Sequence, residues 1–177
     1  MQKAIIGIGL PGAGKTTVLR NFAAHHNYAY ISIDQIRTEL TGDIGDNMRT
    51  PEVWDLARQK TSDLIKNGET IVFDATFKRQ HNRRDFITWL RREGVRQVQG
   101  LYISTPIEVA RERNSLRERP APDEIIELTH KLITESPPDI ADGFDSLFVL
   151  NKNHELTRVE IAREERTLRK EMRIRNK

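Results

Sequence analysis

Nine residues near the start of the sequence have the types and the spacing that are needed to hold a polyphosphate. Gly9-Leu-Pro-Gly-Ala-Gly-Lys-Thr-Thr17 fits the pattern G-x-x-x-x-G-K-[ST] at every fixed position. The glycines permit positive φ angles and close backbone approach, so the N–H groups of the loop can point at the phosphates. Lys15 is expected to reach the β- and γ-phosphates, and the Thr16 hydroxyl to bind Mg²⁺. The residues that we expect to contact the nucleotide are Gly12, Ala13, Gly14, Lys15, Thr16 and Thr17.

Two aspartates stand at the ends of later predicted strands. The alternating segment Tyr28–Ile33 leads into Asp34, and the apolar segment Glu69–Ala75 contains Asp74. Ligands of parallel sheets gather beyond the carboxyl ends of the strands, so both carboxylates should lie near the nucleotide, where either could reach Mg²⁺ through water. Asp34 could accept the proton of an acceptor hydroxyl in phosphoryl transfer, or it could cap the helix that follows. Asp74 could act on the acceptor, or it could hydrogen-bond Thr16.

A third candidate segment is rich in arginine and is interrupted by prolines. Four arginines fall within nine residues, and prolines at 120 and 122 break the predicted helix that carries them. Positive charge and exclusion of water both favour the departure of a γ-phosphoryl group, so residues 111–122 are predicted to form an arginine-bearing lid. The alternative is a solvated helix face. The four side chains are Arg111, Arg113, Arg117 and Arg119.

The pattern of apolar segments predicts the fold class. Five short strands alternate with helices, which indicates an α/β fold with a parallel sheet covered on both faces. We expect one domain over residues 1–151, followed by a charged C-terminal helix over residues 152–177. The expected strands cover residues 4–8, 28–33, 69–75, 95–104 and 146–151.

Composition limits the functions that the chain could have. There is no cysteine, and no apolar run is long enough to span a bilayer, so we expect a cytoplasmic protein without a disulfide framework. The net charge is +3, but Lys78–Arg96 holds seven basic and two acidic residues. That block is either a basic binding face or a solvated surface.

Four motifs together resemble the phage-type 5′-hydroxyl polynucleotide kinases, and more broadly the P-loop kinases that include zeta toxins. The motifs are Gly9–Thr17, Ile31-Ser-Ile-Asp-Gln-Ile-Arg37, Val72-Phe-Asp-Ala-Thr76 and Arg113-Asn-Ser-Leu-Arg117. The resemblance covers about residues 3 to 151 and implies a nucleoside-kinase-like P-loop NTPase fold, a three-layer sandwich with a five-stranded parallel sheet. Relatives often carry Asn-Leu-Asn after the third strand, where this sequence has Thr76-Phe77-Lys78.

The resemblance also implies roles for individual residues. Asp34 would be the general base, and Arg37 would grip the acceptor phosphate. Asp74 would order the acceptor or the water shell of the metal, while Arg113 and Arg117 would clamp the phosphates of ATP. The residues implied to line the acceptor side are Thr76, Arg79 and Arg83.

Three functions are compatible with this pattern. The first is an ATP- and Mg²⁺-dependent kinase that phosphorylates the 5′-OH end of DNA or RNA. The second is a kinase for a small molecule, such as a nucleoside, a sugar or an aminosugar nucleotide. The third is an ATP-dependent switch or binding module, because a P-loop identifies the nucleotide and not the acceptor. The guanine-reading motif Asn-Lys-x-Asp does not occur, which weakens a GTPase interpretation.

Overall fold

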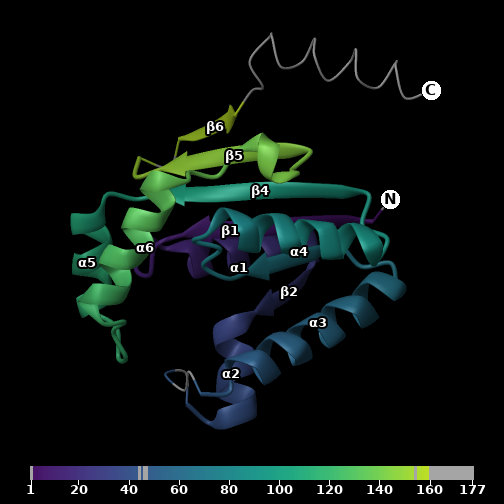
Figure 1. The fold of residues 1–177 in the computed structure, drawn as a ribbon, viewed down its shortest axis with the longest axis horizontal. Coiled ribbons are helices and arrows are strands. Elements are labelled where there is room, and N and C mark those ends of the chain that lie inside the picture. Colours follow the sequence, from purple (N-terminus) through teal and green to yellow (C-terminus); the bar gives the residue numbers. More distant parts are fainter. Residues whose placement is uncertain (1, 44, 46–47, 154, 160–177) are drawn as a thin grey trace.

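A six-stranded sheet forms the centre of the computed structural model, which describes residues 2–43, 45, 48–153 and 155–159 (Figure 1). The strand order is β2-β3-β1-β4-β5-β6; the first five strands run parallel, and β6 is antiparallel to β5. The predicted parallel strands are therefore confirmed, and a sixth strand is added. The strands are β1 (Lys3–Gly9), β2 (Ala29–Ser32), β3 (Ile71–Asp74), β4 (Gln97–Ser104), β5 (Ser146–Asn151) and β6 (Leu156–Val159).

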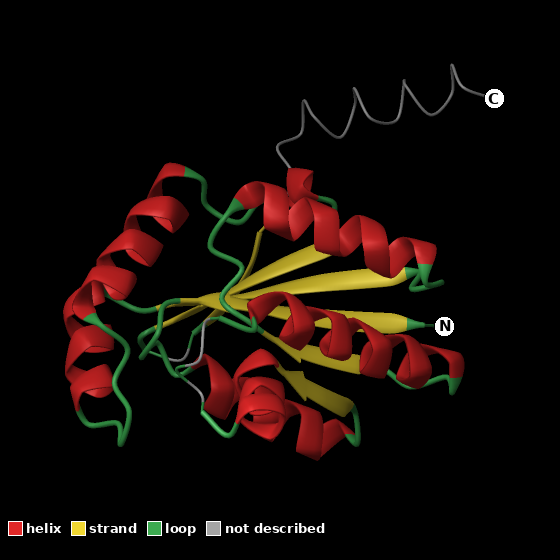
Figure 2. Ribbon diagram, turned by 60° about the horizontal axis from the view of Figure 1, so that its bottom comes forward, coloured by secondary structure: helices red, strands yellow, loops and turns green. Residues whose placement is uncertain are grey.

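Both faces of the sheet are covered, as the continuous apolar character of its central strands requires. Alternate residues of β1 separate between two core clusters: Ala4, Ile6 and Ile8 belong to one, and Ile5 belongs to the other. Helices accordingly flank the strands in Figure 2. This is the three-layer α/β sandwich that the sequence predicts.

Helices fill the connections between the five parallel strands. Each begins or ends close to the carboxyl edge of the sheet, which lies on the left in Figure 1. This edge is therefore built from helix termini and loops, where a ligand can reach backbone N–H groups. The helices are α1 (Lys15–His26), α2 (Ile33–Thr41), α3 (Thr50–Lys66), α4 (Gln80–Arg92), α5 (Ile107–Ser115) and α6 (Asp123–Glu135), with a 3₁₀ turn, η1, at Ile140–Asp142.

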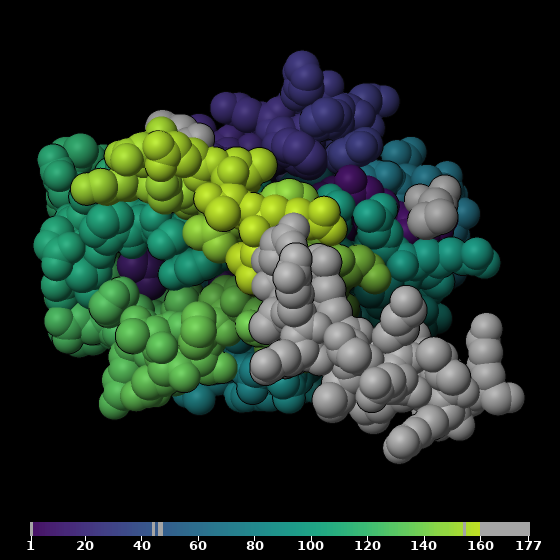
Figure 3. Space-filling view, turned by 90° about the horizontal axis from the view of Figure 1, so that it is seen from above, coloured from purple at the N-terminus to yellow at the C-terminus, as the bar shows by residue number. Residues whose placement is uncertain are grey.

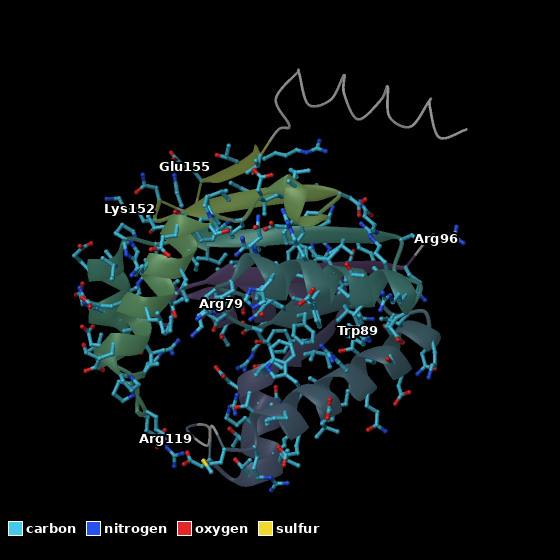
Figure 4. All side chains as sticks on the ribbon, in the orientation of Figure 1. Arg79, Trp89, Arg96, Arg119, Lys152 and Glu155 are labelled. Carbon is cyan, nitrogen blue, oxygen red and sulfur yellow. The ribbon has the colours of Figure 1, made fainter. Side chains whose placement is uncertain are left out.

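The segment predicted to be a lid, residues 111–122, is the end of α5 and its connection to α6, and the two helices together form a helical arm. Arg111 ties the two helices together, because its guanidinium pairs with Asp123 at 2.6 Å and also with Glu127. At the tip of the arm, Arg119 Nη1 lies 2.6 Å from Asp43 Oδ1, in the loop that follows α2. Figure 4 shows Arg119 at this tip, across the carboxyl edge of the sheet.

The C-terminal segment corrects one prediction. Leu156–Val159 is a strand, β6, and not part of a helix over residues 152–177; residues 160–177 lie outside the described part of the chain. These four residues contain two β-branched side chains, and they pair with β5 through a short turn. The strand lies on the surface that Figure 3 presents, and Leu156 is 60% exposed. None of the described helices is long and apolar enough to cross a membrane.

Candidate active site

The P-loop adopts a conformation that only glycine supports at two positions. Gly14, the residue before α1, has φ of 90°, and Gly12 has φ of 82°. A Cβ atom on Gly12 would also lie 2.1 Å from the carbonyl oxygen of Ala110 in α5. The loop is therefore pressed against α5, and the N-terminal N–H groups of α1 face the carboxyl edge of the sheet. A helix N-terminus of this kind attracts a phosphate group.

Asp74, at the end of β3, connects the two chemically important residues of the P-loop. Lys15 Nζ lies 2.6 Å from Asp74 Oδ1, and Thr16 Oγ1 donates to Asp74 Oδ2 at 2.7 Å. Tyr30 of β2 donates a third hydrogen bond, from its hydroxyl to the same Oδ2, at 2.7 Å. Of the two alternatives for Asp74, this geometry supports the one in which it hydrogen-bonds Thr16.

The charge state of Asp74 follows from these contacts. Burial by itself raises the pKa of the carboxyl group, but the charge of Lys15 and the three hydrogen bonds outweigh it and hold the pKa below its ordinary range. Burial, followed by the neighbouring Asp74 charge, raises the pKa of Tyr30, so its hydroxyl stays a donor. A hydroxyl and an ionised carboxylate are the oxygen ligands that suit Mg²⁺. Thr16 and Asp74 therefore fit the predicted metal site.

Asp34 lies at the same edge of the sheet and does not cap α2. The cap is Ser32, whose hydroxyl accepts a hydrogen bond from the Gln35 backbone N–H at 3.4 Å. Ser32 is also the register partner of Asp74 on the neighbouring strand. Asp34 therefore lies two residues past the position that is level with the buried Asp74. Its own carboxylate is exposed and has no hydrogen bond or ion pair within the described residues. The capping alternative is thus wrong, and the carboxylate is accessible to a ligand.

The predicted donor-side arginines reach the P-loop unequally. Arg113 contacts the P-loop directly, because its Nη1 donates to the Ala13 carbonyl at 3.4 Å. Arg117 is exposed in the segment between α5 and α6. Asn114 closes that segment, because its side chain donates to the Ala121 carbonyl at 2.8 Å and accepts from the Ala121 N–H at 3.0 Å. The arm is thus anchored at its base, with Arg113 nearest the nucleotide loop.

Three of the residues predicted for the acceptor side lie near the carboxyl edge in different environments. Arg37 is 7% exposed and donates from Nη1 to Thr50 Oγ1, at the start of α3, at 3.1 Å. Thr76 is half-buried just after β3, and Arg79 is exposed immediately before α4. Figure 4 shows Arg79 on the side that faces the α5–α6 arm. A contact of these residues with an acceptor stays a prediction.

Arg83 corrects the sequence-based assignment. It is 0% exposed, so it does not line the acceptor side. Its Nε lies 2.6 Å from Asp142 Oδ2, and Nη1 donates to the Phe77 carbonyl at 3.2 Å. Its Nη2 donates to the Ser136 and Pro137 carbonyls at 2.9 and 3.2 Å. Arg83 therefore holds the loop after β3 in place through Phe77, whose φ is +46°.

A cavity of about 380 Å³ lies beyond the ends of β4 and β5, next to the P-loop. Leu10 of the P-loop lines it together with Thr105 and Asn151. It lies beside the phosphate site and is large enough for part of a nucleoside.

Sequence reasoning missed three residues of this site: Tyr30, Ser32 and Asn114. The hydroxyls of Tyr30 and Ser32 lie within a segment that was interpreted as strand, where alternation indicates only which face a side chain takes. Asn114 lies within the motif Arg113–Arg117, in which the resemblance implies roles for the two arginines. The available signal was that Ser32 and Asn114 lie within motifs whose other residues have an implied function; Tyr30 lies outside those motifs.

The P-loop, the aspartate at the end of the neighbouring strand and the order of the parallel strands define a P-loop kinase fold. The family model described as AAA domain matches residues 5–136, and the chain belongs to that family. The resemblance to P-loop kinases that the sequence predicts is thereby confirmed.

Three known proteins indicate the range of relatives. A mimivirus protein (Acanthamoeba polyphaga mimivirus), named as a bifunctional polynucleotide phosphatase/kinase, is 22% identical over 116 residues. These are 66% of this chain and 24% of the relative, so the chain spans about a quarter of that protein. A chain of the Pnkp1/Rnl/Hen1 RNA repair complex superposes with a TM-score of 0.69 and 17% identity, covering 91% of this chain and 49% of that one. A sugar kinase from Janibacter sp. HTCC2649 superposes with a TM-score of 0.60 and 21% identity, and the match covers 88% of each chain.

Proposed function

We propose that this chain is an ATP-dependent kinase that transfers the γ-phosphate to a hydroxyl group, with the 5′-OH end of DNA or RNA as its acceptor. The observation that carries the proposal is the accessible Asp34 carboxylate, two residues beyond the strand position that pairs with Asp74. The same carboxylate could orient a water molecule in an ATPase switch, so the phosphorylated product, and not Asp34 alone, separates the two functions.

The residues divide the reaction between them. The acceptor oxygen attacks the γ-phosphorus, the bond to the β-phosphate bridging oxygen breaks, ADP leaves, and Asp34 takes the hydroxyl proton. Lys15 leaves its ion pair with Asp74 to bind the β- and γ-phosphates. Arg113 and Arg117 supply positive charge from the arm. Thr16 and Asp74 would hold Mg²⁺, which would supply positive charge to neutralise the phosphates.

Charge near the carboxyl edge supports a polymeric acceptor. Within the block Lys78–Arg96, Arg79 is exposed immediately before α4 at this edge, whereas Arg83 is buried and Arg96 lies at the opposite edge of the sheet (Figure 4). An extended polyanion gains from exposed cations at this edge, such as Arg79 and, in the arm, Arg117, whereas an uncharged sugar does not. The mimivirus relative is named as acting on polynucleotides, which agrees with this acceptor.

A small acceptor is the second candidate. The Janibacter sugar kinase covers 88% of this chain and is itself covered to 88%, so a chain of similar extent serves a small molecule on the same fold. The loop after β3, Thr76-Phe77-Lys78, also departs from the polynucleotide kinase pattern.

Transfer of labelled phosphate from ATP decides between these acceptors. We expect incorporation into 5′-OH oligonucleotides that falls steeply as salt is raised, because phosphate contacts release counterions. Incorporation into sugars or nucleosides alone, with little response to salt, would establish the small-molecule kinase. Protein-stimulated ATP hydrolysis without any phosphorylated product would establish the switch.

The Asp34→Asn variant tests the assignment of the base. We expect ATP binding to be unchanged and turnover to fall by about 10²–10⁴-fold, the usual contribution of general base catalysis. Glu39→Gln is the matched control, because Glu39 is exposed on the same helix and pairs with Lys60 instead of facing the site. An active Asp34→Asn variant would remove Asp34 as the base.

A further inference from the structure

Tyr30 is the one residue of the Asp74 cluster that belongs neither to the P-loop nor to β3. It lies on β2, two residues before Ser32, the register partner of Asp74. Its side chain points to the face of the sheet that α1 covers, and the Arg20 guanidinium lies 5.7 Å from the centre of its ring. From there the hydroxyl reaches Asp74 Oδ2 at 2.7 Å, the atom that also accepts from Thr16.

We propose that Tyr30 is a positioning residue for the metal site, which holds the Asp74 carboxylate in place while Lys15 is engaged with the phosphates of the nucleotide. This inference rests on the proposed nucleotide and Mg²⁺ site. It assigns a function to Tyr30, a side chain that is not part of the P-loop motif.

The argument begins with the change that the nucleotide imposes on Lys15. In the structure Lys15 is the partner of Asp74 Oδ1 at 2.6 Å, and it supplies the cation that compensates for a carboxylate whose side chain is only 3% exposed. A P-loop lysine binds the β- and γ-phosphates once they arrive. Asp74 must then stay oriented without that ion pair, although a buried carboxylate requires hydrogen bonds to stay ionised.

Two hydrogen bonds to Asp74 do not involve Lys15 and so remain when Lys15 binds the phosphates. Thr16 and Tyr30 both donate to Oδ2, which leaves Oδ1 directed toward the site that Lys15 vacates. Thr16 is itself an expected metal ligand, so its orientation depends on the same event. Tyr30 is anchored independently, because β2 is hydrogen-bonded to β3 and the ring packs against α1. Its hydroxyl therefore fixes the rotation of the carboxylate before the metal binds.

Tyr30→Phe tests the inference, with binding of fluorescent ADP as the readout. We expect the affinity in EDTA to stay within about twofold of the unaltered protein, because the ring and the P-loop are retained. The tightening of ADP binding on addition of Mg²⁺ should fall by about tenfold, the effect of losing one hydrogen bond to a charged group. Tyr28→Phe is the control: Tyr28 packs on the same face of the sheet and should leave both affinities unchanged.

A double-mutant cycle separates positioning from packing. In an Asp74→Asn background, Tyr30→Phe should cause no further loss of Mg²⁺-dependent tightening, because the two side chains act through one contact. A full Mg²⁺ effect in Tyr30→Phe, or an equal loss with and without Mg²⁺, would overturn the inference. Mg²⁺-dependent ADP binding without phosphoryl transfer to any acceptor would refute the proposed function alone.

Discussion

Replacing Arg83 by methionine should destabilise the whole domain, although the sequence places Arg83 among the acceptor-binding residues. The guanidinium has no exposed surface and donates to the Asp142 carboxylate at 2.6 Å and to three backbone carbonyls. Methionine fills a similar volume but leaves the buried Asp142 charge without this partner. Removing one member of a buried ion pair costs about 3–5 kcal/mol.

Equilibrium urea unfolding measures this effect. We expect the free energy of unfolding to fall by about 3–5 kcal/mol in Arg83→Met, which is a large share of the roughly 5–15 kcal/mol of a typical domain. Arg84→Met is the matched control, because Arg84 is half exposed and its Nε lies 3.7 Å from Asp142 Oδ1. That variant should change stability by less than about 1 kcal/mol.

Two further variants keep the prediction testable if Arg83→Met does not fold. Arg83→Lys retains the charge but not the fork of donors, so it should be intermediate in stability. Adding Asp142→Asn to Arg83→Met should recover part of the loss, because the unpaired charge is removed. A stable Arg83→Met variant that has instead lost acceptor affinity would refute the structural role and restore the role that the sequence suggests.

Two other predictions concern the P-loop and Asp74. Gly12→Ala should weaken ADP binding at least about tenfold and lower the melting temperature. The added Cβ would lie 2.1 Å from the Ala110 carbonyl oxygen, and Gly12 has a positive φ. Titration calorimetry measures the binding, and an unchanged affinity would contradict the packing of α5 on the loop. The lowered pKa of Asp74 means that its ionised form adds stability above the ordinary value of 3.8, and that this stability is lost as the pH falls through the lower value in the folded protein. The difference in unfolding free energy between the unaltered protein and Asp74→Asn should therefore be constant above about pH 5 and shrink below pH 3.8; a difference that grows in acid would contradict the ionised state.

The donor half of the site was predictable from the sequence because it is local. The glycines, Lys15 and Thr16 lie within one loop, and the conformation of that loop follows from residue types that occupy consecutive positions. Asp74 was predictable as a strand end, since parallel strands bring their carboxyl ends to one edge. Its partners were left as alternatives, because only the register of β1 and β3 places Lys15 and Thr16 at the carboxylate.

The errors share a physical cause, which is that burial is decided by tertiary packing. The resemblance implies an acceptor-side position for Arg83, but Asp142, 59 residues away, pairs with it in the interior. The cap of α2, one of two alternatives for Asp34, is Ser32, two residues earlier, because α2 begins at Ile33 within the segment that the sequence predicts as strand. Leu156–Val159 was expected to be helical because strong helix formers follow it, and the available edge of β5 overrides that preference.

The contact between Gly12 and Ala110 has a consequence for how this domain can vary. Since α5 rests on the nucleotide loop and Asn114 fixes Ala121, the arm is anchored by buried contacts close to that loop, whereas its tip is held by the exposed Arg119–Asp43 ion pair. Insertions or deletions between residues 115 and 120 would alter the reach of the tip, and the position of Arg117 with it, without changing the conformation of the phosphate loop. The phosphate loop and α5 must therefore keep their lengths, whereas the connection between α5 and α6 can change in length.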